Sequence, residues 1–187
     1  MSAAELARRA AAEISAAVAG LDDASAAELV DAIAAAKRIV VYGVGREGLM
    51  MRALGMRLYH LGLDAHVVGD MGAPPVGEGD LLLVSAGPGH FSTVAALVGV
   101  ANDAGATTAA ITAQPGGRVP RSTDIVFVIP AQTMADDTPG AGGTSVLPMG
   151  SLYEGAQYVA FEVLVLMLRE RLGVAPDQMR DRHTNLE

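Results

Sequence analysis

Short apolar segments alternate with helical segments along the middle of the chain, and this alternation constrains the fold more than any other feature. The clearest apolar segments are Arg38–Tyr42 and Asp80–Ser85, and each is followed by a glycine-rich loop and a helical pattern. Strands that are apolar throughout are typical of parallel sheets, because βαβ crossovers place helices on both faces. The sequence therefore predicts a doubly wound α/β fold of three layers, with a parallel sheet between helices.

The expected elements follow in a regular order. Two helices, over 3–18 and 24–36, precede the first strand, and Ser25 with Glu28 predicts a capping box for the second helix. The expected strands span 38–42, 65–68, 80–85, 107–112 and 124–129, and the later helices span 49–61, 92–104 and 152–172.

We expect one domain over 1–187, because this length suits a single well-buried core. Its expected parts are N-terminal helices over 1–36, a parallel sheet core over 38–130, a loop over 131–150, a long helix over 152–172 and a tail over 177–187. The loop is rich in Thr, Gly, Pro and Asp and has no periodicity. A loop of this length inside a compact domain is usually functional.

Composition narrows the classes of function. The chain has no cysteine, which excludes disulfides and thiolate chemistry, and a cytoplasmic location is the default expectation. The net charge of -8, with acidic and basic residues intermixed, argues against nucleic-acid binding. No apolar run reaches the roughly 18 residues of a membrane span, since Glu162 interrupts the longest candidate. The histidines are dispersed, so we predict no metal site, and we predict no cofactor.

Two glycine-rich loops are the candidate ligand-binding segments, because ligands of open parallel sheets bind beyond the carboxyl ends of the strands. The first loop runs from Gly43 to Gly48, and its candidate substrate-binding residues are Gly45, Arg46 and Glu47. Its glycine spacing also fits the dinucleotide fingerprint, with Asp70 as the ribose partner. A nicotinamide-dependent oxidoreductase is therefore one alternative.

The second loop leads directly into a helix, so its backbone N–H groups and hydroxyls point toward one position near the positive helix end. This arrangement favours an anion or a polyol as the ligand. The residues that we assign to substrate binding here are Ser85, Gly87, Gly89, His90, Ser92 and Thr93. The alternative is an ordinary glycine turn in which Ser92 caps the helix.

From Arg38 to the C-terminus, the chain resembles the sugar isomerase (SIS) domain family, and within it the 6-phospho-3-hexuloisomerases. The resembling segments are Gly43-Val44-Gly45-Arg46, Met56 to Gly62, Val68-Gly69-Asp70, Gly79 to Leu82, Leu147 to Ser151 with Glu154, and Arg182-His183 with Asn185-Leu186-Glu187. The resemblance implies a five-stranded parallel sheet of flavodoxin-like order. It also implies a homodimer or homotetramer with shared active sites, and interconversion of a 3-hexulose 6-phosphate and fructose 6-phosphate.

A ketose isomerase moves a proton between adjacent carbons through an enediol, which needs a base at the carbon and a donor at the carbonyl oxygen. The resemblance implies that Glu154 is this base and that His183 is an acid or base. It further implies that the tail carrying His183 reaches a neighbouring subunit, and that Ser151 belongs to the substrate site.

Two departures from the family's pattern fall at the phosphate-binding loops. Glu47 stands where the family's Gly-Arg-Ser-Gly loop has a serine, and the family's Ser-Gly-Ser-Gly-x-Thr loop appears as the longer Ser85–Thr93 segment with Pro88 inside. A carboxylate about 4 Å from a phosphate charge costs roughly 4 kcal/mol at an effective dielectric of about 20. Either Glu47 points away from the ligand, or the ligand is not an ordinary sugar phosphate. The alternatives are an isomerase of an unphosphorylated or differently substituted sugar, and a non-catalytic regulator that binds phosphosugars.

Overall fold

Five parallel strands form one sheet in the computed structural model, which describes residues 1–137 and 145–186. The strands are β1 (Ile39–Tyr42), β2 (Ala65–Val67), β3 (Leu81–Ser85), β4 (Thr107–Thr112) and β5 (Ile125–Val128), in the order β2-β1-β3-β4-β5. All neighbouring pairs are parallel. The predicted fold class is confirmed. The strand order reverses between β1 and β3, which is where ligands bind in sheets of this kind.

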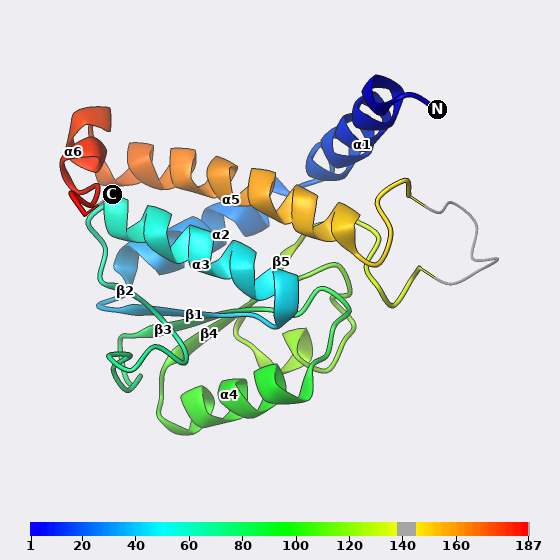
Figure 1. The fold of residues 1–187 in the computed structure, drawn as a ribbon. Helices are drawn as coiled ribbons and strands as arrows, with labels where there is room; N and C mark the ends of the chain where they lie inside the picture. The colour runs from blue at the N-terminus through cyan, green and yellow to red at the C-terminus, as the bar shows by residue number, and fades with distance from the viewer. Residues whose placement is uncertain (138–144, 187) are drawn as a thin grey trace.

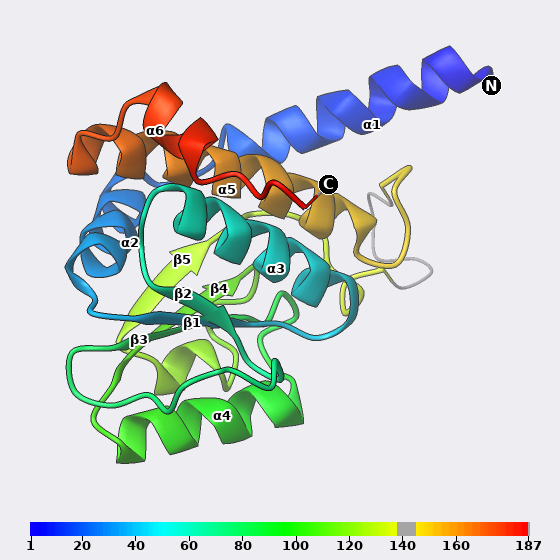
Figure 2. The ribbon, with the colours of Figure 1, turned by 60° about the vertical axis from the view of Figure 1, so that its left-hand side comes forward.

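Helices cover both faces of the sheet (Figure 1). α2 (Asp23–Ala35), α3 (Gly45–His60) and α5 (Ser151–Leu172) lie on one face, and α4 (Ser92–Asp103) with the short 3-10 helix η1 (Pro120–Ser122) lies on the other. α1 (Ala3–Val18) packs against α5 and projects away from the sheet, as Figure 2 shows. α6 (Pro176–Asp181) lies against the C-terminal end of α3.

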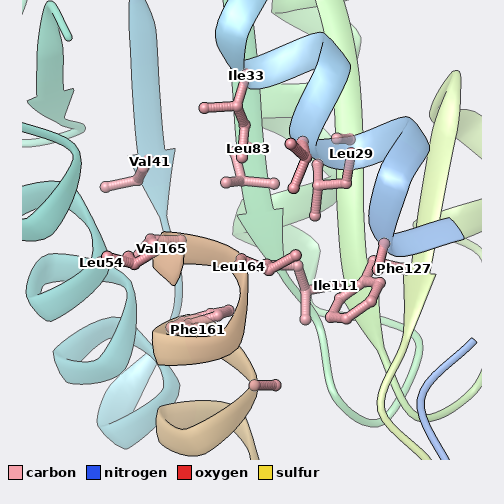
Figure 3. Close-up of a cluster of buried hydrophobic side chains, with 14 of the residues drawn as sticks. Leu29, Ile33, Val41, Leu54, Leu83, Ile111, Phe127, Phe161, Leu164 and Val165 are labelled. Atoms are coloured by element: carbon pink, nitrogen blue, oxygen red, sulfur yellow. The ribbon is translucent and has the colours of Figure 1, made fainter. Parts of the chain in front are cut away.

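Two clusters of buried apolar side chains hold the layers together. The larger cluster lies between the sheet and α2, α3 and α5, and includes Leu29, Leu54, Leu83, Phe127 and Leu164 (Figure 3). The smaller cluster joins the other face to α4. α5 is long and apolar enough to cross a membrane by length and composition, yet half of its most apolar window is buried inside the protein. Core packing therefore accounts for the apolar character of α5.

Two local predictions need correction, and two short helices were not predicted. The N-cap of α2 is Asp22, whose carboxylate accepts a hydrogen bond from the N–H of Ser25 at 2.7 Å, so the predicted capping box of Ser25 and Glu28 is wrong. α3 begins at Gly45 and not at Leu49, because Gly45 adopts the left-handed φ of 58° that turns the loop directly into the helix. α6 and η1 were not predicted, since each is too short to show a period.

Candidate active site

A cavity of about 310 Å³ lies where the loops after β1 and β3 meet the N-terminal end of α5. Its walls come from the first turn of α3, the β3–α4 loop, the segment before α5, and the first turn of α5. The residues that line it are Val44, Gly45, Arg46, Glu47, Pro88, Phe91, Thr133, Met134, Met149, Gly150, Tyr153 and Glu154. The cavity thus lies at the reversal of strand order, where the topology predicts a ligand.

Glu47 lies in the first turn of α3, in the wall of the cavity, and only 7% of it is exposed. Its Oε2 accepts hydrogen bonds from the Ser85 hydroxyl at 2.5 Å and from the N–H of Gly87 at 2.9 Å. The Glu47 carboxyl group therefore accepts hydrogen bonds from two groups that the sequence analysis predicted to bind the substrate. Burial raises the pKa of Glu47, and the hydrogen bonds from Ser85 and Gly87 oppose this shift.

Ser85 is the centre of a buried polar network that joins β3, α3 and α5. Gln157 donates a hydrogen bond to its hydroxyl at 2.9 Å, and the Tyr153 hydroxyl lies 3.5 Å from it. Burial, and then the negative charge of Glu47, raise the pKa of Tyr153 well above the usual tyrosine value. A Cβ on Gly87 would lie 2.8 Å from the Tyr153 ring and 2.9 Å from Glu47 Oε1. Only glycine allows this close approach of the loop.

Glu154 lies in the first turn of α5 and faces the same cavity. Arg46 contacts Glu154 Oε2 at 3.0 Å, and it also donates to the Ser151 hydroxyl at 2.7 Å and to the Met149 carbonyl at 2.8 Å. The Glu154 side chain is 17% exposed and that of Arg46 is 50% exposed. Burial raises the pKa of Glu154, the Arg46 charge opposes this shift, and nearby Glu47 adds to it.

The backbone before α5 turns sharply, and this turn directs Glu154 into the cavity. Met149 has a φ of 54° and Gly150 a φ of 82°, so two consecutive residues are left-handed. The left-handed conformation costs a non-glycine residue about 1–2 kcal/mol. The Met149 N–H donates to the Asp137 carboxylate at 2.5 Å and its carbonyl accepts from Arg46, so contacts on both sides hold the strained residue.

The structure brings together only part of the predicted substrate-binding set. Gly45, Arg46 and Glu47 line the cavity, and Ser85, Gly87 and Ser151 contact residues that line it. Four further predicted residues do not line the cavity: Gly89, His90, Ser92 and Thr93. Of these, Gly89 forms a left-handed turn packed against Gly117, and the other three are exposed at the start of α4.

His183 lies far from the cavity of its own chain. Its ring stacks on that of His60 with centroids 5.4 Å apart, and the neighbouring Arg182 donates to the His60 carbonyl at 3.1 Å. His60 ends α3, whereas Glu47 lies in its first turn. The length of the helix therefore separates His183 from the cavity by about 20 Å. A single chain does not bring Glu154 and His183 together.

Several lining residues were not predicted individually. Thr133 and Met134 belong to the 131–150 segment, whose length and composition marked it as functional without identifying side chains; residues 138–144 of it lie outside the described part. Tyr153 precedes Glu154 but carries no signal of its own. Asp70, which the dinucleotide alternative requires, contacts Arg52 at 3.1 Å and does not line the cavity. Within the described residues, no group of three or more His, Asp or Glu is placed to hold a metal ion.

Comparison with known proteins gives the chain its family. It is 37% identical over 175 residues to a 3-hexulose-6-phosphate isomerase of Mycobacterium gastri, covering 94% of this chain and 86% of the relative. It is 32% identical over 167 residues to a 3-hexulose-6-phosphate isomerase of Bacillus subtilis strain 168, covering 89% of each. The fold is similar, with a TM-score of 0.83, to that of a Methanococcus jannaschii protein whose crystal structure infers a molecular function of 3-hexulose-6-phosphate isomerase. That match has 25% identity and covers 98% of this chain and 99% of the other. Residues 32–167 match the SIS domain, and the chain therefore belongs to the SIS domain family.

Proposed function

We propose that this protein is a sugar isomerase that interconverts a 3-hexulose 6-phosphate and fructose 6-phosphate. The observation that carries the proposal is Glu154, a partly buried carboxyl group of raised pKa in a cavity at the reversal of strand order. A raised pKa brings the carboxyl group nearer to neutral pH, where it can both take and return a proton. Relatives named 3-hexulose-6-phosphate isomerase, similar over most of the chain, support this substrate pair.

The reaction needs two proton movements on carbon and two on oxygen. Glu154 removes the proton from C2 of the 3-hexulose while the carbonyl oxygen on C3 gains a proton, which forms the enediol. Glu154 then returns its proton to C3 while the hydroxyl on C2 loses one, which gives the 2-ketose. Arg46 holds Glu154 through their 3.0 Å contact and places a positive charge where negative charge develops on the substrate oxygens.

We further propose a cytoplasmic homodimer or homotetramer in which His183 completes the cavity of a neighbouring subunit. The separation of about 20 Å favours this arrangement, because His183 stacks on His60 at the opposite end of α3 from the cavity of its own chain. Large apolar side chains are also exposed on α3 and α5, among them Leu49, Met56, Tyr59 and Leu166. Exposed apolar surface of this kind is typical of contacts between protein chains.

A second candidate substrate is an unphosphorylated or differently substituted sugar. Glu47 favours it, because its carboxyl group takes the Ser85 and Gly87 donors that would otherwise hold an anion. A thermal-shift comparison separates the two candidates, since binding to the native state raises the melting temperature. Stabilisation by fructose 6-phosphate but not by fructose supports the first candidate, and the reverse supports the second.

Glu154→Gln tests the base directly. The amide keeps the size of the side chain but takes no proton, so we expect a loss of isomerisation of about 10²-fold or more with ligand binding still measurable by thermal shift. Glu162→Gln is the matched control, because Glu162 lies on the same helix, pairs with Arg57 at 3.1 Å and does not line the cavity. Wild-type turnover in Glu154→Gln would reject Glu154 as the base.

A further inference from the structure

The two oxygen atoms of the Glu47 carboxyl group have different surroundings. Oε2 accepts both hydrogen bonds, from Ser85 and Gly87, and no described residue donates one to Oε1. The buried side-chain nitrogen and oxygen atoms without a partner, among the described residues, are Gln132 Nε2 and Gln157 Oε1. Glu47 Oε1 is not one of them, so it retains contact with the cavity that Glu47 lines. Because Oε2 already accepts two donors, a proton on this carboxyl group resides on Oε1.

The other polar groups of the cavity lining are poorly suited to exchange a proton with a sugar. The Arg46 guanidinium is a donor without an acceptor atom, and it is already directed to Glu154, the Ser151 hydroxyl and the Met149 carbonyl. Burial raises the pKa of Tyr153 well above its usual value, so its hydroxyl does not ionise. The Thr133 hydroxyl donates to Asp136 at 2.8 Å. Apart from Glu154, Glu47 is therefore the described lining residue whose side chain both gains and loses a proton readily.

Resting on the proposed isomerase function, we infer that Glu47 is a second catalytic residue, which exchanges protons with the substrate oxygens while Glu154 exchanges one with its carbons. Oε1 gives its proton to the carbonyl oxygen on C3 as Glu154 takes the proton from C2. The resulting Glu47 carboxylate then accepts the proton of the C2 hydroxyl as Glu154 returns its proton to C3. Both carboxyl groups end in their starting states, and the step needs no other reactant.

The charges around Glu47 fit this role. The groups around it are Arg46 on its own helix, Glu154 and Tyr153 on α5, Ser85 at the end of β3, and Gly87 in the β3–α4 loop. Arg46 is directed to Glu154, and no ion pair joins Glu47 to any described cation. Burial raises the pKa of Glu47 against the opposing hydrogen bonds from Ser85 and Gly87, and so favours the neutral acid, which is the form that starts the reaction. The neutral acid also removes the repulsion between Glu47 and a substrate phosphate.

Glu47→Gln tests the inference, because its amide oxygen can accept from Ser85 and Gly87 while its NH₂ group occupies the position of Oε1 without transferring a proton. We expect kcat to fall by about 10² to 10⁴-fold, with KM within about threefold of wild type. The alkaline limb of the kcat/KM profile, which reports the acid, should disappear. Glu47→Asp should keep such a limb at a changed pH, and Glu162→Gln should behave as wild type.

Several outcomes overturn the inference and leave the proposed function intact: wild-type kcat in Glu47→Gln, or an alkaline limb that is unchanged in that variant. If Glu47→Gln does not fold, an alkaline limb at the wild-type pH in Glu47→Asp is equally decisive. If the wild-type protein does not isomerise the 6-phosphates, the proposed substrate fails separately. A ¹³C NMR titration then measures the pKa of the Glu47 carboxyl group, whose signal is assigned by its loss or shift in the Glu47 variants. A pKa above the ordinary glutamate value supports the inference, and a pKa at or below that value overturns it.

Discussion

At the scale of single residues, Glu47 makes the stability of the protein depend on pH. Its folded-state pKa is raised from the ordinary value of 4.5, so the folded protein binds this proton more tightly than the unfolded chain does. The resulting stabilisation is complete below pH 4.5 and is lost as the pH rises through the raised pKa. We therefore expect Glu47→Gln to lose less stability than wild type over this rise. Urea unfolding of wild type and Glu47→Gln at a series of pH values measures the free energy of unfolding of each. A difference between the two that stays constant with pH would contradict the prediction.

The sequence identified Glu47 as unusual but did not predict its direction. The sequence shows that residue 47 is a carboxylate in a loop that we expected to bind phosphate. Its direction depends on where α3 begins, because a start at Gly45 places Glu47 in a helical turn facing Ser85, whereas a start at Leu49 would leave it in a loop. The contact with Ser85 joins residues far apart in the chain, and no local pattern encodes it.

At the scale of elements, the cap of α2 gives a quantitative test. Asp22 caps this helix through its 2.7 Å hydrogen bond to the Ser25 N–H, and Glu28 takes no part in the cap. We expect Asp22→Ala to lower the free energy of unfolding by about 0.5–2 kcal/mol, and Glu28→Gln to leave it nearly unchanged. Chemical denaturation of both variants measures the two effects. An equal loss in both would restore the capping box.

The strands were easier to predict than the helix starts for a physical reason. The clearest strand, β3 (Leu81–Ser85), is a run of buried residues that is apolar up to Ser85 and follows the polar Asp80, so burial itself marks where it begins. The start of α3 depends on the backbone conformation of Gly45, and that of α2 on the choice between Asp22 and Ser25 as cap. Side-chain and backbone details of this kind leave no periodic signal.

At the scale of the whole molecule, the sequence predicted that the loops after β1 and β3 meet, but it did not predict where His183 lies relative to Glu154. Alternating strands and helices require a parallel sheet, so the loops after β1 and β3 share one edge. The position of His183 was not accessible in this way, since it depends on how α6 docks at the end of α3. In the described chain, Glu154 therefore lies in the cavity, and His183 lies at the opposite end of α3.

This separation predicts complementation between two inactive variants. If His183 acts in a neighbouring subunit, a dimer of Glu154→Gln with His183→Ala contains one site with both changes and one intact site. Random mixing by co-refolding should then restore about a quarter of the wild-type rate, because about half of the dimers are mixed and each has one intact site of two. If both groups acted within one chain, no mixed dimer would contain an intact site. Activity that stays at the level of the separate variants would therefore place the His183 function outside the shared site.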